Sequence, residues 1–170
     1  MNPEAWGFIG AIIGAIVGAA ASIVTTIISG RHTRQLQELS DSFERSERSR
    51  TFQRTNLLEV QETLAAYIRL MGRAFLEDSA HFRQNPGATA RGLLSADLNQ
   101  EIMDCGRRLM LLIERIENDD IRTASKRFRF EADKVLDARS IPEGERIMFK
   151  SATDFQTLMS EIGTALRRLY

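Results

Sequence analysis

The chain has 170 residues, and its 23 basic and 23 acidic side chains leave no net charge at pH 7. A balanced charge gives no overall field that would attract nucleic acid, so the composition argues against a nucleic-acid-binding protein. The single cysteine, Cys105, excludes an intrachain disulfide and is compatible with a reducing compartment.

The first predicted element is a transmembrane helix over residues 5–30, which contain no charged side chain although 27% of the whole chain is charged. An α-helix rises about 1.5 Å per residue and the hydrocarbon core of a bilayer is about 30 Å thick, so about 20 residues are enough to cross it. A cleaved signal peptide does not fit, because the apolar run is too long and only Glu4 precedes it as a charged side chain. Residues 1–30 are therefore predicted to be a short N-terminus and one membrane-spanning helix.

Small residues in this span fall on one side of the predicted helix, and bulky aliphatic residues fall on the other. Lipid removes the hydrophobic force between helices, and small residues compensate by letting two backbones approach closely. We therefore predict that this side associates with another transmembrane helix, in a second copy or in a different membrane protein. The predicted association face consists of Gly7, Gly10, Ala11, Gly14, Ala15, Gly18, Ala19 and Ser22.

The charges that flank the span predict its orientation. Arg31 and Arg34 follow it directly, whereas the N-terminal side offers only the α-amino group against Glu4. Because positively charged flanks stay in the cytoplasm, we expect a protein of the inner (plasma) membrane with its N-terminus outside. The remaining residues, 31–170, are then cytoplasmic.

Residues 31–55 are predicted to form a juxtamembrane helical stalk that continues the span, since they are polar and lack Pro and Gly. An apolar seam and then a polar gap follow the same three-and-four spacing: Leu36, Leu39 and Phe43, then Ser46, Arg50 and Gln53. This pattern predicts a helix that pairs as a short coiled coil near the bilayer and then enters a packed domain. Charges of both signs indicate a solvated stalk rather than a lipid-headgroup site.

Residues 56–170 are predicted to form an antiparallel bundle of four amphipathic helices, so the whole chain is expected to be all-α. The first helix continues the stalk and ends near Arg83, because the following Asn85-Pro86-Gly87 disfavours helix. The others are expected at about residues 95–118, 120–138 and 141–169. The last start is the best marked, since Ser140, Pro142 and Glu143 fit a capping box with an early proline.

The second and third of these helices are alternatively one continuous rod, which would give a three-helix arrangement, and Asn118-Asp119 is the turn that decides between the two. Each helix has an apolar face that we expect to be buried. In chain order, these faces are Leu57, Val60, Leu64, Tyr67 and Met71; Leu98, Ile102, Cys105, Leu109, Leu112 and Ile116; Ile121, Ala124, Phe128, Ala132 and Val135; and Met148, Ala152, Phe155, Met159, Ile162, Leu166 and Leu169.

A search for catalytic and ligand-binding motifs finds none that is complete. Asp78 and His81 share a helix face, as in half of a dimetal site, but no second Glu-x-x-His motif exists. Cys105 lies on an apolar face, where a buried small hydrophobe is the ordinary role. The basic and aromatic stretch 126–130 is expected to bury Phe128 and to leave its arginines solvated or ion-paired. The sequence thus predicts no enzyme, no cofactor, no metal, and neither a nucleic acid nor a small-molecule substrate as partner.

Two functions fit these features. In the first, a single-pass anchor holds a cytoplasmic helical module at the membrane, where the module recruits or scaffolds partners and the copies associate through the small-residue face. In the alternative, that face assembles many copies into a pore-forming or holin-like oligomer that the bundle gates. A periplasmic rod, a third function, would need the orientation that Arg31 and Arg34 oppose.

Overall fold

The computed structural model describes residues 3–85 and 94–169, and the side chains of those residues from position 37 onward. The described chain is helical and contains no strand. Four α-helices, α1 (Pro3–Gln84), α2 (Ala96–Glu114), α3 (Asp119–Asp133) and α4 (Ile141–Arg168), are joined by one 3-10 turn, η1 (Lys134–Asp137). The predicted all-α class and the number of helices are confirmed, and α2 and α3 are separate helices rather than one rod.

The chain is divided into two compact units, Met1–Arg48 and Ser49–Tyr170. In the first unit, the described side chains of residues 37–48 are all exposed. The predicted span, its association face and the flanking Arg31 and Arg34 lie outside the residues whose side chains are described. Of the helical segments that are described in full, none has both the length and the apolar character needed to cross a bilayer.

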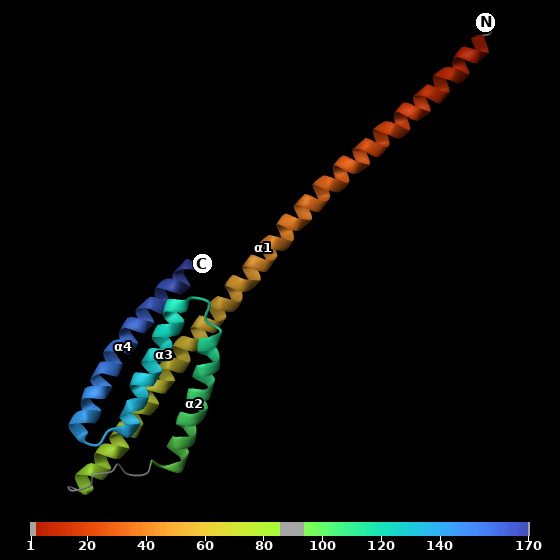
Figure 1. The fold of residues 1–170 in the computed structure, drawn as a ribbon. Coiled ribbons are helices and arrows are strands. Elements are labelled where there is room, and N and C mark those ends of the chain that lie inside the picture. Colours follow the sequence, from red (N-terminus) through yellow and green to blue (C-terminus); the bar gives the residue numbers. More distant parts are fainter. Residues whose placement is uncertain (1–2, 86–93, 170) are drawn as a thin grey trace. The chain divides into compact units, whose positions relative to one another are not determined.

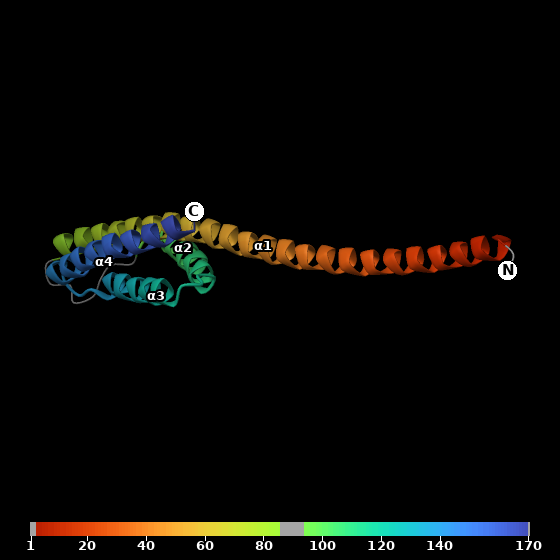
Figure 2. The same ribbon diagram turned by 90° about the horizontal axis from the view of Figure 1, so that it is seen from above.

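The second unit is a four-helix bundle in which successive helices alternate in direction (Figures 1 and 2). Helices α1 and α2 are antiparallel, because the residue numbers of contacting pairs rise along α1 as they fall along α2. Gln53 contacts Arg115 at one end, and Glu77 contacts Ser95 at the other. Helices α3 and α4 pair in the same way, since Phe128 lies 6.0 Å from Phe155 between ring centroids, while Glu131, later on α3, accepts from Lys150, earlier on α4. Short connections force this up-and-down order.

The core of the bundle lies along one line on each helix. Side chains that are less than 2% exposed include Leu64 and Met71 of α1, Leu109 and Ile113 of α2, and Ile162 of α4. Burial of such side chains contributes about 1.5–3 kcal/mol each, before the entropy of ordering the chain is subtracted. The predicted inward faces of the second and third helices are confirmed except at Cys105 and Ala124, which are half-buried.

On the predicted inward face of the fourth helix, Ile162 and Leu166 are buried and Met148, Phe155, Met159 and Leu169 are half-buried, but the prediction is wrong at Ala152, which is exposed. The buried line of α4 instead includes Gly144, Ser151 and Leu158. Gly144 and Ser151 are not apolar enough to mark a core face, but both are small, and Gly144 lies where α4 approaches Phe75 of α1. A Cβ atom on Gly144 would lie 2.7 Å from the Phe75 ring, so close approach requires glycine here.

The end of α1 and the start of α4 follow local sequence signals. Helix α1 ends at Gln84, immediately before Asn85-Pro86-Gly87. Helix α4 begins after Ser140, whose hydroxyl accepts from the Glu143 backbone N–H at 3.4 Å. The Glu143 carboxylate accepts from the backbone N–H of Arg139 (2.9 Å), one residue before the position that a standard capping box uses. The third predicted helix ends in the 3-10 turn η1 rather than in a regular α-helical turn.

Candidate functional site

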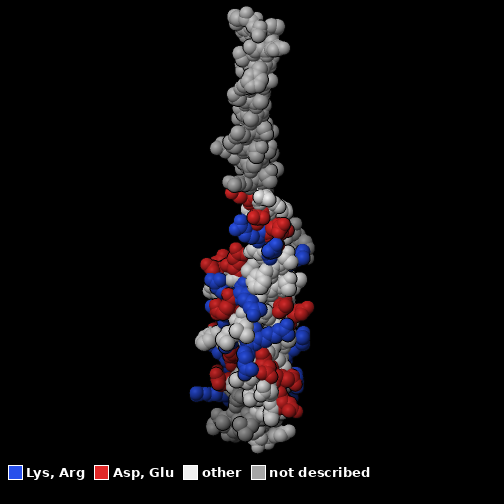
Figure 3. All heavy atoms as spheres, turned by 90° about the vertical axis from the view of Figure 1, so that its right-hand side faces the viewer, with Lys and Arg blue, Asp and Glu red and all other residues white. Residues whose placement is uncertain are grey.

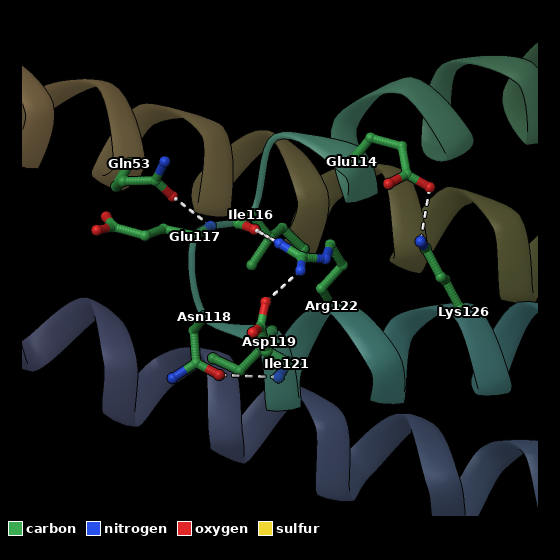
Figure 4. A network of polar contacts seen from close by, with 9 residues as sticks. All are labelled: Gln53, Glu114, Ile116, Glu117, Asn118, Asp119, Ile121, Arg122 and Lys126. Atoms are coloured by element: carbon green, nitrogen blue, oxygen red, sulfur yellow. Dashed lines mark hydrogen bonds and ion pairs between the residues drawn. The ribbon is translucent and has the colours of Figure 1, made fainter.

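The turn between α2 and α3 is held against α1 by side chains that bond to its backbone (Figure 4). The Gln53 amide donates to the Arg115 carbonyl at 3.1 Å and accepts from the Glu117 N–H at 3.1 Å. One turn further along α1, the buried Asn56 donates to the Leu112 carbonyl at 3.2 Å. The Gln53 bonds satisfy the Arg115 carbonyl and the Glu117 N–H at the end of α2, whereas the Leu112 carbonyl also accepts from the Arg115 N–H at 3.1 Å. Together the three bonds fix α1 to the turn.

The same turn is closed from the α3 side. Arg122 donates to the Ile116 carbonyl at 2.8 Å and pairs with Asp119, while the Asn118 side chain caps α3 by accepting from the Ile121 N–H at 3.0 Å. Lys126 reaches back across the turn to Glu114 at 2.7 Å (Figure 4). Helices α2 and α3 are therefore linked at this end of the bundle by polar contacts in addition to the buried Ile116 and Ile121.

An apolar groove of about 310 Å³ lies between α2 and α3 beside these contacts. Met110 of α2 and Phe130 of α3 line it and are 45% and 65% exposed, while Ile113 in its lining is buried. Charged groups surround these apolar side chains, since the ion pairs Glu114–Lys126 and Arg129–Asp133 also line the groove. Met103, seven residues before Met110 on the same face of α2, is also exposed (56%) but lies outside the lining of the groove. An apolar strip between charged rims is the ordinary character of a protein-binding groove.

A side-chain hydrogen bond joins α1 to α3 beside the groove. The Tyr67 hydroxyl donates to the Asp133 carboxylate, which also pairs with Arg129 at 3.6 Å. Burial, and then the hydrogen bond to Asp133, raise the pKa of Tyr67 above its usual range, so this hydroxyl stays protonated as a donor. Gly106 of α2 packs against the Tyr67 ring, since a Cβ atom built there would lie 3.4 Å from it, in ordinary van der Waals contact. The hydrogen bond between Tyr67 and Asp133 thus fixes α3 to α1 beside the groove.

A second and larger hollow, of about 900 Å³, lies between α3 and α4; most residues that line it are polar or charged, and Ile121, Ala124 and Ala165 also line it. Its α4 side contains Thr157 and Thr164, whose hydroxyls donate to carbonyls of their own helix. Its charged side chains are of both signs, including Arg127 and Glu161. This surface has neither an apolar centre nor a single sign of charge, so it selects no class of partner.

An ion-pair cluster links the other end of α3 to α4. The Glu131 carboxylate accepts from Lys134 at 2.6 Å and from Lys150 of α4 at 2.7 Å. The hydrogen bonds from Lys134 and then Lys150 lower the pKa of Glu131 from 4.5 to about 2. The ionised carboxylate therefore favours the folded state.

This cluster predicts a loss of stability in acid. Because the folded pKa of Glu131 is below the unfolded value, its contribution is complete above pH 4.5 and is lost as the pH falls toward 2. We expect Glu131→Gln to lower the melting temperature at neutral pH and to reduce the further drop between pH 4.5 and pH 2. Thermal unfolding at several pH values measures both, with the exposed Glu145→Gln on α4 as the matched control. An equal acid-induced drop in Glu131→Gln and wild type would contradict this role.

The residues considered for chemistry from sequence are not brought together. Cys105 is half-buried, its Sγ lies 3.7 Å from the Thr63 carbonyl, and burial raises its thiol pKa. Asp78 is buried, while His81 is half-buried and lies edge-on to Phe82. Among the described residues, no three His, Cys, Asp or Glu side chains lie close enough together to hold a metal ion.

The basic and aromatic stretch on α3 has the arrangement that the sequence predicts. Phe128 is 2% exposed, and Lys126 and Arg129 are ion-paired. The face of the molecule in Figure 3 carries basic and acidic side chains intermixed, with uncharged surface between them. Phe130, which lines the groove and is exposed, was not among the residues that the sequence pattern singled out. The signal was its position outside the apolar face of α3, together with Met103 and Met110 outside that of α2.

The chain matches no protein-family model, and no curated protein or solved structure shows significant similarity to it.

Proposed function

We propose that this chain is a non-enzymatic, membrane-anchored interaction protein, which holds a cytoplasmic helical bundle at the inner (plasma) membrane. The anchor is the charge-free stretch 5–30, with its N-terminus outside and Arg31 and Arg34 on the cytoplasmic side. The small-residue face of this anchor associates with a second copy or with another membrane protein. The bundle then presents its surface to partners that meet it at the membrane.

The observation that supports the interaction role is the apolar groove between α2 and α3. Large apolar side chains are exposed here on an otherwise charged surface. A partner that covers them removes apolar surface from water, which favours binding. Methionine is flexible and polarisable, so Met103 and Met110 can repack against a partner side chain. The groove runs between two antiparallel helices, which suits an amphipathic helix whose apolar residues recur every three or four positions.

Membrane placement is tested first. Full-length protein is expected to sediment with membranes and to resist carbonate extraction, and the bundle is expected to be protected from external protease in intact spheroplasts. Recovery in the soluble fraction, or cleavage of the bundle from outside, would contradict the anchor or its orientation.

The groove is tested by site-specific photo-crosslinking in the full-length chain. A photoreactive residue in place of Phe130 is expected to give discrete crosslinks in the membrane fraction, because Phe130 lines the groove. The matched control is the same residue in place of Phe149, an α4 aromatic that is 78% exposed and lies outside the groove lining. Met110→Asp should abolish the crosslinks from position 130, since a charge in the groove must be desolvated on binding. Equal crosslinking from positions 130 and 149 would overturn the proposal.

A further inference from the structure

A lysine lies against the exposed ring of Phe130. The Nζ atom of Lys134 is 4.8 Å from the centroid of that ring, which is the distance of a cation–π contact. The two residues are four positions apart, where α3 continues into η1, so their side chains lie close together on the surface. Phe130 lines the groove between α2 and α3, whereas Lys134 does not. Lys134 can therefore affect the groove through the Phe130 ring.

The ammonium group of Lys134 is itself held in place. It donates to the Glu131 carboxylate at 2.6 Å, and the same carboxylate accepts from Lys150 of α4 at 2.7 Å. The Glu131 side chain is only 20% exposed. Charge-assisted hydrogen bonds from two sides keep this carboxylate in one position, so it anchors Lys134 beside the ring.

The other polar neighbours of Phe130 on α3 are directed elsewhere. Lys126, four positions before it, is ion-paired with α2 at 2.7 Å. Asp133, three positions after it, accepts a hydrogen bond from α1. Arg127, three positions before it, lines the hollow between α3 and α4. Of these four neighbours on the helix surface, Lys134 is the one whose charge lies against the ring.

This contact favours one position of the ring. An exposed side chain moves between staggered rotamers within nanoseconds, and Phe130 is 65% exposed, so packing alone does not hold it. A cation over the ring stabilises the rotamer in which the contact forms, and in that rotamer Phe130 lines the groove with Met110. A ring that is ordered before a partner arrives lowers the entropy that binding costs.

We propose that Lys134, anchored by Glu131, is a positioning residue that holds the Phe130 ring at the groove for a partner helix. This inference rests on the proposed binding role of the groove, and it names the residue that prepares that site. The ion-pair cluster between α3 and α4 thereby controls a surface that α2 and α3 form.

Fluorine NMR of the full-length protein in detergent tests the position of the ring, with 4-fluorophenylalanine in place of Phe130. Lys134→Gln removes the cation and should move the fluorine resonance, whereas Lys134→Arg keeps a cation and should leave the resonance near its wild-type position. Lys150→Gln is the matched control, because Lys150 donates to the same carboxylate and the cation–π contact to Phe130 comes from Lys134. This control should leave the resonance in place.

Photo-crosslinking of the full-length protein in membranes tests the effect on binding. A photoreactive residue in place of Met110 samples the groove while Phe130 and Lys134 remain. Lys134→Gln should reduce these crosslinks about two- to fivefold, the effect of one exposed cation–π contact. Lys134→Arg and Lys150→Gln should leave them near the wild-type level.

A fluorine resonance that does not move in Lys134→Gln, or that moves equally in Lys150→Gln, would overturn the inference. Undiminished crosslinks from position 110 in Lys134→Gln would overturn it as well. If the otherwise unchanged chain gives no crosslinks from position 110 while the resonance responds to Lys134 alone, the binding role of the groove fails and the positioning of the ring stands. Failure of the inference and failure of the proposed function are therefore distinguishable.

Discussion

Replacing Leu109 with Ala is expected to lower the free energy of unfolding by about 2–5 kcal/mol, the largest effect of any single change considered for this chain. Leu109 of α2 is fully buried in the bundle core. Truncation removes the transfer free energy of its methyl groups and leaves a cavity that the neighbouring helices fill only in part. Urea unfolding of the full chain in detergent, followed by far-ultraviolet circular dichroism, measures the loss.

Leu111→Ala is a matched control for this change, because it deletes the same atoms two residues further along α2. Leu111 is 55% exposed, so its replacement should change stability by no more than about 0.5 kcal/mol. Similar losses from the two variants would mean that α2 does not bury the face described above.

Replacing Gly144 with Ala should destabilise the bundle by about 1–3 kcal/mol, although alanine favours helix over glycine by about 1 kcal/mol. The added Cβ would lie 2.7 and 2.8 Å from two atoms of the Phe75 ring, so the ring or the helix must move. Overpacking therefore outweighs the gain in helix propensity. The same urea experiment measures the sign of the change.

Phe75→Leu provides the test of that cause. A shorter side chain at position 75 leaves space for the new Cβ, so the double variant should be more stable than the sum of the two single changes predicts. Additive effects would show that Gly144 is required for a reason other than its approach to Phe75.

Local sequence signals predicted the parts of the fold that local interactions determine. Asn85-Pro86-Gly87 stops α1 because proline and glycine cannot continue a helix at low cost. Ser140 begins α4 because its hydroxyl accepts a backbone N–H that the helix leaves unpaired. In both places the residues that cause the boundary are within four positions of it.

The end of α2 was predicted at Asn118 but occurs at Glu114, since distant residues determine it. The Gln53 amide donates to the Arg115 carbonyl, and Arg122 donates to the Ile116 carbonyl. Asn118 is not part of α2 and instead caps α3. The pattern within residues 95–118 could not reveal this contact, because Gln53 lies 62 positions from Arg115 along the chain.

The groove between α2 and α3 also could not be predicted from the pattern of either helix alone. Periodicity identifies the buried face of each helix, but Met110 and Phe130 lie off those faces and become neighbours only when the two helices pair. The error at Ala152 has the related cause that close packing selects small residues such as Ser151, which hydropathy does not mark. The membrane span lies outside the described side chains and stays a prediction from its lack of charge.

The Gln53 bonds to the α2–α3 turn carry an evolutionary consequence. Both of its partners are main-chain groups, the Arg115 carbonyl and the Glu117 N–H. Drift at positions 115 and 117 therefore leaves the two bonds intact, whereas position 53 must keep a side chain that both donates and accepts at that reach. Among homologues, an amide at position 53 should persist while the residues of the turn it holds diverge.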